Sequence, residues 1–496
     1  MERNDRRQNS KPAVKSQRKF SGKSGDRSTG LKTVSRSASV VKQSDRSAEM
    51  VELRHYPARC PYYKRCGGCT MINIPYEEQV SRKQSLVEEM IGEFGTVDPI
   101  IRMKNPDHYR NKVTSVFAKD KTGHGMGLNY NPGSFGAAGK SSHADGRGVA
   151  RENGVGRGNG AGRNSGKGQR PNRSVICGIY EKDSHEVVPV VKCLLENTKA
   201  DAIIQSVLAL IPSFKIEPYD EDRGTGTLRY VQVRTAHATH QIMVTLVTSD
   251  AIFPSKNNFV TALRKLQPEI TTIIQNINGR TDSMILGDRE KVMFGPGYIE
   301  DRLCGKTFRI SSRSFYQVNS IQTEKLYNIA IDDAGLSGKE TVLDAYCGIG
   351  TIGICASSHA KQVISVELNS DAVRDARENV RLNSCDNVTV YGNDATVFMQ
   401  ELAEAGKKID VLLMDPPRAG ATEDFLRAAV KLFPSKIVYI SCAPDTLGRD
   451  LGFLSKNGYS MKKATPVDMF PATATSHVET VVLMSRVSNE PRAGRA

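Results

Sequence analysis

From about residue 307 onward, short apolar stretches alternate with longer segments in which apolar residues recur at helical spacing. The apolar stretches read TVLDAYCG, QVISVEL, DVLLMDPP, IVYISCAP and VETVVLM. In one of the intervening segments, SDAVRDARENVRLN, Val373, Ala376 and Val380 fall on one face of a helix. Nearly continuous apolar strands joined by such helices predict a doubly wound α/β sheet.

The chain before residue 307 has a different pattern and is predicted to form a separate domain. LRYVQVRT and HQIMVTLVT alternate in the manner of paired antiparallel strands, within a region of mixed elements. We therefore expect a mixed α/β domain over residues 53–306 and a Rossmann-like domain over residues 307–487. No apolar run is long enough to cross a bilayer, and the polar N-terminus lacks the apolar core of a signal peptide. We expect a cytoplasmic monomer with no membrane partner.

The positive charge of the chain is concentrated in two segments of low apolar content. Residues 1–50 hold 13 Lys and Arg against 5 Asp and Glu, and residues 133–173 hold 8 against 2. These excesses of +8 and +6 account for 14 units of the formal charge of +15. Such segments cannot bury enough surface to fold alone, so we predict a disordered basic tail (1–52), a disordered Gly- and Arg-rich insertion (133–173) and a short C-terminal tail (488–496). Their charge suits contact with nucleic acid, although a solubilising role explains the same composition.

A glycine-rich loop follows the first of the C-terminal apolar strands. LDAYCGIGTIG contains Gly348, Gly350 and Gly353 between a strand and a helix, where backbone N–H groups can approach a nucleotide-like ligand. Glu367 ends the next strand, where a carboxylate can accept both ribose hydroxyl groups. Asp394 follows a further strand, where it can meet an adenine edge. The series predicts a nucleoside cofactor.

Two acidic positions favour S-adenosylmethionine over a nicotinamide dinucleotide. Asp344 lies just before the glycine loop, where methyltransferases often hold an acid near the amino-acid part of this cofactor. In DPPRAG, Asp415 and two prolines form a stiff strand end beside the cofactor, as in base methyltransferases. Arg418 stands where enzymes that methylate amines carry an aromatic residue, which argues against amine chemistry. An oxidoreductase that used the same glycine loop would leave DPPRAG unexplained.

Cys442 follows the strand IVYIS, at the sheet edge where α/β enzymes place their chemistry. Taken alone, such a cysteine is more often a small core residue than a catalytic one. A thiolate that adds to C6 of uracil makes C5 nucleophilic, and a base must later remove the C5 proton. Glu479, in DMFPATATSHVETVVLM, is the candidate base, although it could equally be a solvated acid at a strand edge. His477 is a candidate to orient Glu479.

In this order, SFYQVN, LDAYCGIGTIG, DPPRAG, YISCAPDTLGRDL and DMFPATATSHVETVVLM resemble the motifs of the RNA uracil-C5 methyltransferase family, over roughly residues 54–487. The resemblance implies a class I methyltransferase domain that uses S-adenosylmethionine and forms 5-methyluridine, preceded by an RNA-facing α/β domain. It implies Cys442 as the nucleophile, Glu479 as the proton acceptor and Phe315 as a residue near the base. The cofactor contacts that it implies are Gln317, Tyr346, Glu367, Asp394 and Asp415.

CPYYKRCGGC places Cys60, Cys66 and Cys69 within ten residues, so the three can face one metal centre. Cys193 is the best candidate for a fourth ligand, and it lies on the far side of the insertion. The spacing alone does not separate a four-cysteine zinc site from an iron–sulfur cluster. The resemblance favours a 4Fe-4S cluster held by these four cysteines, as in the ribosomal-RNA branch of the family.

That branch implies 23S ribosomal RNA as the partner, with the target uridine flipped out of a loop or an opened stem. Many relatives begin with a small β-barrel RNA-binding domain, whereas this chain has its basic tail in that place. Transfer RNA therefore stays an alternative substrate. Two different functions also stay open: a cytosine-C5 methyltransferase, which shares the thiolate mechanism, and a non-catalytic iron–sulfur protein that binds RNA.

Overall fold

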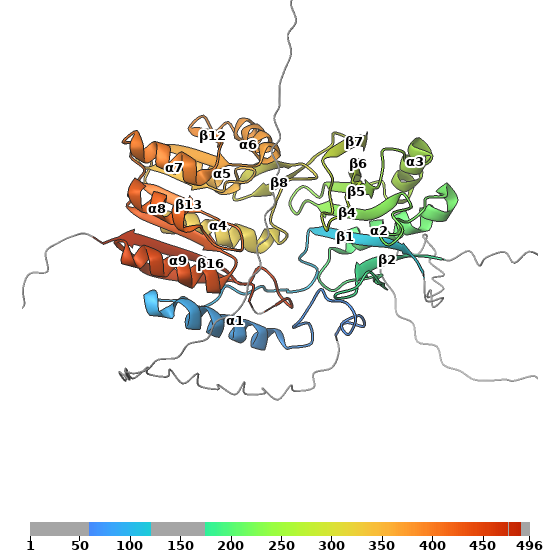
Figure 1. The fold of residues 1–496 in the computed structure, drawn as a ribbon, viewed down its shortest axis with the longest axis horizontal. Coiled ribbons are helices and arrows are strands. Elements are labelled where there is room, and N and C mark those ends of the chain that lie inside the picture. The colour runs from blue at the N-terminus through green and yellow to red at the C-terminus, as the bar shows by residue number, and fades with distance from the viewer. Residues whose placement is uncertain (1–58, 121–173, 475, 488–496) are drawn as a thin grey trace, which may run out of the picture. The chain divides into compact units, whose positions relative to one another are not determined.

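The computed structural model of the protein describes residues 59–120, 174–474 and 476–487 (Figure 1). The two basic segments and the C-terminal tail predicted from the sequence lie outside these residues. Within the described ranges, no helix is both long enough and apolar enough to span a membrane. The domain limits at residues 53, 306 and 487 stay predictions.

Seven strands from the first part of the described chain form one sheet, in the order β3-β2-β1-β4-β5-β6-β7. β4 and β5 pair antiparallel, as predicted for LRYVQVRT and HQIMVTLVT, whereas β5 and β6 run parallel. Two helices, α2 (Thr198–Phe214) and α3 (Lys256–Leu266), pack against this sheet and enclose an apolar core with it. The strands are β1 (Lys112–Lys119), β2 (Val175–Tyr180), β3 (Val187–Pro189), β4 (Leu228–Thr235), β5 (Ile242–Thr248), β6 (Ile270–Ile277) and β7 (Arg289–Phe294).

A hairpin connects the first sheet to the second. Its strands, β8 (Ile299–Leu303) and β9 (Lys306–Ile310), pair antiparallel. The stretch after the hairpin returns to β1, because the side-chain amide of Asn111 donates to the Gln317 carbonyl oxygen at 3.0 Å. The segment after β9 is therefore hydrogen-bonded to the first sheet, although it leads into the second.

The second sheet has seven strands in the order β12-β11-β10-β13-β14-β16-β15. The first five run parallel, and β16 runs antiparallel to both of its neighbours. The strands are β10 (Thr341–Ala345), β11 (Gln362–Glu367), β12 (Val388–Gly392), β13 (Val411–Met414), β14 (Lys436–Ser441), β15 (Tyr459–Val467) and β16 (Glu479–Arg486). The helices are α4 (Ser320–Ala334), α5 (Thr351–Ala356), α6 (Ser370–Leu382), α7 (Ala395–Glu404), α8 (Glu423–Leu432) and α9 (Pro444–Lys456).

Both faces of the second sheet are buried under helices. Val342 of β10 points into a core with α4, α5 and α6, whereas its neighbour Leu343 points into a core with α7, α8 and α9. Because successive side chains of a strand point to opposite faces, a strand buried on both sides must be apolar throughout. The doubly wound α/β fold predicted from the sequence is thus confirmed (Figure 1).

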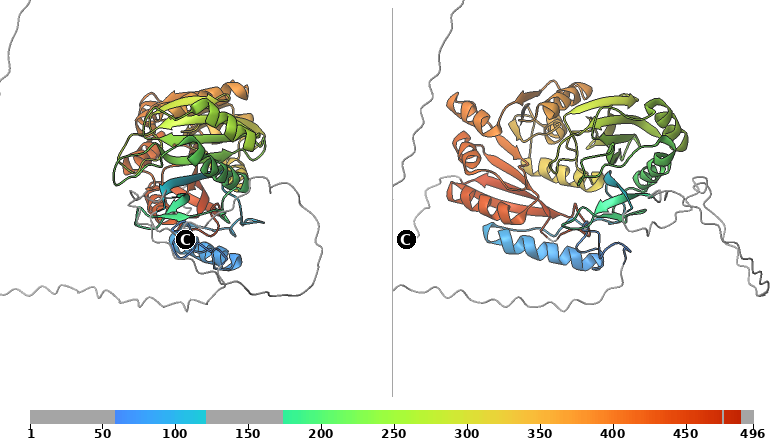
Figure 2. Two further views of the ribbon diagram at one scale, coloured as in Figure 1. Left: turned by 90° about the vertical axis from the view of Figure 1, so that its right-hand side faces the viewer. Right: turned by 45° about the vertical axis from the view of Figure 1, so that its right-hand side comes forward.

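The segment before β1 packs against the second sheet, which the sequence pattern did not predict. α1 (Tyr76–Ile91) lies against α9 (Figures 1 and 2). The chain that follows α1 forms isolated parallel bridges with β15, at Val97–Ala464 and Ile101–Val467. Residues from the N-terminal part of the described chain therefore support the sheet that carries the predicted chemistry.

Candidate active site

The glycine loop follows β10 at the carboxyl end of the second sheet. Tyr346 adopts a φ of 64° and Gly350 a φ of 83°, which turn the chain from the strand into α5. The N–H of Gly353 donates to Asp344 Oδ2 at 3.0 Å, and a Cβ on this glycine would come within 2.6 Å of the same oxygen. Asp344 thus holds the loop against the strand, and burial raises the pKa of its carboxyl to about 7.

The two acids predicted to bind the nucleoside follow the next two strands. Glu367 accepts the N–H of Gly348 at 3.0 Å on one oxygen and the N–H of Asn369 at 2.8 Å on the other. Asp394 caps α7, since its Oδ1 accepts two N–H groups at the start of that helix, at 2.9 and 3.1 Å. Both carboxylates are therefore held in fixed positions by backbone N–H groups.

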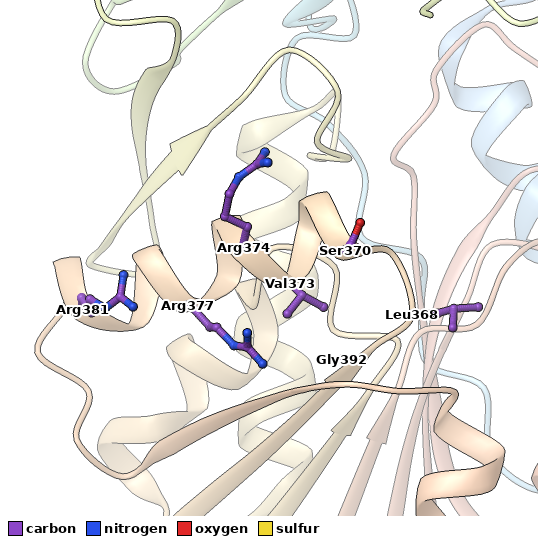
Figure 3. Close-up of a pocket in the computed structure, with 7 residues that line it drawn as sticks. All are labelled: Leu368, Ser370, Val373, Arg374, Arg377, Arg381 and Gly392. Carbon is purple, nitrogen blue, oxygen red and sulfur yellow. The ribbon is translucent and has the colours of Figure 1, made fainter. Parts of the chain in front are cut away.

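Close to these acids, a groove is lined by three arginines of α6 (Figure 3). Arg374 and Arg381 pair with carboxylates of the same helix, at 2.9 and 3.0 Å, and Arg377 donates to a carbonyl oxygen of β12 at 3.2 Å. Because each guanidinium already has a partner, we assign no separate anionic ligand to these arginines. Its lining is completed by Leu368, Ser370, Val373 and Gly392.

A second, small cavity lies between the glycine loop, α4 and the stretch after β9. Tyr327 and Thr323 of α4 line it too, and the Tyr327 hydroxyl lies 3.3 Å from Thr351 Oγ1 at the start of α5. These α4 residues were missed in the sequence because inward-facing residues at helical spacing look like ordinary core positions. Four predicted site residues line the cavity: Phe315, Gln317, Tyr346 and Asp415.

Cys442 and Glu479 are brought together by the pairing of β14 with β16. Ser441, the last residue of β14, lies opposite Thr480 in this antiparallel pair. The paired residues end there, and Cys442 and Glu479 are the next residue on each side, close enough for the charge of Glu479 to raise the pKa of the Cys442 thiol. The side chain of Glu479 is 4% exposed, and its Oε2 has no hydrogen-bond partner in the described structure. A buried oxygen without a partner is costly to the fold, so it calls for an explanation such as a catalytic role.

The ionisable side chains at this end of β14 and β16, namely Asp415, Cys442 and Glu479, influence one another's pKa. Burial raises the pKa of Asp415 to about 7, and burial together with Asp415 raises the pKa of Glu479 to about 8. Burial, followed by the charges of Glu479 and Asp415, raises the pKa of the Cys442 thiol to about 11, and Arg418 opposes this rise. The two carboxyls and the thiol therefore titrate as one group of interacting sites.

His477 lies near this end of β16, two residues before the strand begins. Burial, then the charges of Arg418 and Lys83, lower the pKa of its imidazole. Since Oε2 of Glu479 has no hydrogen-bond partner, His477 does not hold that oxygen. The orienting role considered for His477 thus receives no support from the hydrogen bonds.

The four predicted metal-ligand cysteines are all half-buried, and three of them pack around one small apolar core. Burial and the neighbouring thiols raise the pKa of Cys69 to about 11, and burial and Glu196 raise that of Cys193 to about 12. The N–H of Leu195 donates to Cys193 Sγ at 3.5 Å. Among the described residues, no group of three or more His, Cys, Asp or Glu side chains forms a site for a metal ion. The four cysteines are Cys60, Cys66, Cys69 and Cys193.

Comparison with known sequences finds RNA methyltransferases. A family model described as tRNA (Uracil-5-)-methyltransferase matches residues 229–487. An uncharacterized RNA methyltransferase of Listeria innocua is 36% identical over 441 residues, which cover 88% of this chain and 85% of that protein. An uncharacterized RNA methyltransferase of Clostridium tetani is 36% identical over 430 residues, which cover 86% of this chain and 82% of that protein.

Among solved structures, the chain is similar to the Pyrococcus abyssi tRNA (uracil-54, C5)-methyltransferase, which was crystallised in complex with S-adenosyl-L-homocysteine. The TM-score is 0.62 and the sequence identity 23%, over 84% of this chain and 85% of that chain. The two proteins therefore share a fold across both sheets.

Proposed function

Because the chain belongs to the RNA uracil-C5 methyltransferase family and is an S-adenosylmethionine-dependent RNA methyltransferase, we propose that it methylates C5 of a uridine in 23S ribosomal RNA. In this proposal the enzyme acts in the cytoplasm as a monomer. Cys442 is its nucleophile and Glu479 its base. The cofactor is contacted by Gln317, Tyr346, Glu367, Asp394 and Asp415.

One observation carries the assignment: Glu479, whose buried Oε2 has no hydrogen-bond partner in the described structure, lies close enough to Cys442 for its charge to raise the pKa of the thiol. A reaction at C5 of uracil needs a thiolate at C6 and a proton acceptor near C5. A base placed between the two side chains would offer both of these atoms at once. In this proposal, Oε2 of Glu479 is the atom that accepts the C5 proton.

The cavity beside the glycine loop is our candidate for part of the S-adenosylmethionine site, since residues of the loop, Asp415 and Gln317 line it together. When bound there, this cofactor supplies an electrophilic methyl group. Once its thiol has lost its proton, Cys442 adds through Sγ to C6 of the uracil, and the C5–C6 double bond opens so that its electron pair makes C5 nucleophilic. After C5 carries the methyl group, Glu479 accepts the C5 proton and the bond between Sγ and C6 breaks, so that Cys442 is regenerated.

The test is release of tritium from 23S ribosomal RNA that carries 5-tritiated uridine, in the presence of S-adenosylmethionine. We expect Glu479→Gln to form the covalent adduct but to release tritium at least about 100-fold more slowly than wild type, since the amide accepts no proton. The exposed Glu404→Gln on α7 is the matched control and should react like wild type. Equal release by Glu479→Gln and wild type would exclude Glu479 as the base.

The same assay has a pH dependence with a defined sign. A carboxyl whose pKa is raised to about 8 is mostly protonated below that pH and unable to accept the C5 proton. Wild-type release should therefore increase as the pH rises through about 8, where Glu479 becomes a carboxylate.

Transfer RNA is the second candidate substrate, because the matching family model and the similar Pyrococcus abyssi enzyme both carry tRNA in their descriptions. The tritium assay separates the two. Release from 23S ribosomal RNA and none from transfer RNA supports the proposal, whereas the reverse result moves the assignment to transfer RNA.

We also propose that Cys60, Cys66, Cys69 and Cys193 hold a 4Fe-4S cluster with a structural or RNA-positioning role. The thiols influence one another's pKa, yet the described residues contain no site for a single metal ion. The N–H of Leu195 toward Cys193 Sγ is the kind of hydrogen bond that stabilises cluster sulfurs.

Replacing Cys66 with alanine should remove the brown colour and the near-visible absorbance of anaerobically purified protein. The buried Cys385 lies outside this group, so Cys385→Ala should keep the colour. A colourless wild-type protein that contains zinc would overturn the assignment of an iron–sulfur cluster.

A further inference from the structure

Two basic side chains in the middle of the first sheet face each other without an acidic partner. Lys112 of β1 and Arg234 of β4 lie opposite each other in the antiparallel pair. Arg234 is 3% exposed, and its Nη2 donates to the Ser314 carbonyl oxygen at 2.9 Å. Its Nε and Nη1 have no hydrogen-bond partner, and no acidic side chain of the described residues offsets the charge of either group.

The same two strands carry other basic residues, and these do have acidic partners. Arg229, which is also buried on β4, pairs with Glu221 at 2.9 Å. Lys119, at the far end of β1, pairs with Glu217. A buried charge without a partner is costly to the fold. Lys112 and Arg234 therefore differ from Arg229 and Lys119 of the same two strands, which have acidic partners.

Lys112 lies near two other cations, so an anion is expected to bind there. Burial, then the charges of Arg234 and Arg110, lower the pKa of its ammonium group to about 8. All three effects disfavour the positive charge, and a bound anion would oppose them by favouring the charged ammonium group. Because Lys112 is partly exposed and Arg234 is buried, Lys112 is the group that can touch a ligand directly.

Hydrogen bonds connect the strands that carry Lys112 and Arg234 to the segment after β9, which lines the cavity beside the glycine loop. Ser314, which accepts from Arg234, precedes Phe315, and Asn111, which precedes Lys112, donates to the Gln317 carbonyl oxygen at 3.0 Å. Phe315 and Gln317 both line the cavity, and Phe315 is 63% exposed. On the proposed function, an RNA strand that delivers a base to Cys442 would pass close to the exposed Phe315.

We propose that Lys112 and Arg234 form a binding site for a phosphodiester group of the substrate RNA. Lys112 donates to a phosphate oxygen, and the charges of Arg234 and Arg110 add to the positive potential at Lys112. Phosphate is the charge that an RNA strand repeats at every nucleotide, and it fits a compact ammonium group with no carboxylate beside it. The site fixes the path of the strand, so that the target base passes Phe315 on its way to Cys442.

The test is the affinity of the full-length protein for 23S ribosomal RNA as a function of salt concentration. Lys112→Gln should raise the dissociation constant about 10-fold at low salt and reduce the slope of log K against log salt by about 1. Lys112→Arg should restore most of both, because it keeps the charge. The loss should be the same for a uridine-rich RNA and for one without uridine, since a phosphate contact does not read the base.

The matched control is Lys119→Gln on the same strand, where Glu217 already neutralises the lysine. It should leave the salt slope within error of wild type. Binding of S-adenosylhomocysteine should be unchanged in both variants, which shows that the fold is intact. An unchanged slope in Lys112→Gln, an equal reduction in Lys119→Gln, or a loss confined to uridine-containing RNA would each overturn the phosphate site.

Discussion

Replacing Cys442 with alanine is expected to lower the rate of methyl transfer to 23S ribosomal RNA by a factor on the order of 10⁴ or more. Carbon 5 of uracil is a poor nucleophile until a thiolate has added to C6, and no other cysteine lies at the end of a strand paired with Glu479 in the described structure. Cys442 is only half-buried, so its loss leaves no large cavity. Single-turnover transfer of a labelled methyl group measures the effect directly.

A second measurement ties the loss to the covalent step. An RNA that carries 5-fluorouridine has no C5 proton to release, so wild-type enzyme should remain bonded to it through Sγ and C6. Cys442→Ala should form no such adduct, while Cys385→Ala, which removes a buried thiol away from the strand end, should form it normally. If Cys442→Ala transferred methyl groups at the wild-type rate, Cys442 would be a packing residue and the mechanism would be wrong.

Much of the second sheet could be predicted because its strands are buried on both faces. Their sequences are almost entirely apolar, and repeated apolar strands followed by helical stripes are typical of a doubly wound sheet. The strand ends that carry Glu367, Asp415 and Cys442 followed from this pattern. That Glu479 meets Cys442 did not follow from it, because β16 runs antiparallel and its register depends on the intervening β15. The motif resemblance supplied this pair instead.

The elements that were missed have recognisable physical reasons. β15 contains adjacent lysines and a register shift between Met461 and Lys463, so its alternation of apolar and polar residues is interrupted. As an edge strand it needs fewer apolar residues than a central one. The capping role of Asp394 and the loop-holding role of Asp344 were also missed, because a carboxylate that binds backbone N–H groups looks in sequence like one that binds a ligand.

The contact between α1 and the loop after β15 depends on a pairing of residues far apart in the chain. Lys83 Nζ donates to Asp468 Oδ1 at 2.7 Å, and both side chains are fully buried. The Tyr76 hydroxyl donates to the other oxygen of Asp468 at 2.9 Å. Gln79, also on α1, accepts the N–H of Ala472 at 2.7 Å, and Ala472 has a φ of 64°. α1 therefore fixes the loop that leads into Glu479.

Lys83→Met should lower the free energy of unfolding by about 3–5 kcal/mol, because it leaves Asp468 as a buried charge without its partner. The matched control is Lys431→Met, which breaks an exposed pair with Glu404 and should change stability by less than about 1 kcal/mol.

The double variant Lys83→Met with Asp468→Leu removes both charges and should recover a large part of the loss, since the cost comes from the unpaired carboxylate and not from the missing pair. Urea unfolding of the three variants measures these differences. A Lys83→Met protein as stable as wild type would show that Asp468 finds another partner, and that α1 does not hold the loop through this ion pair.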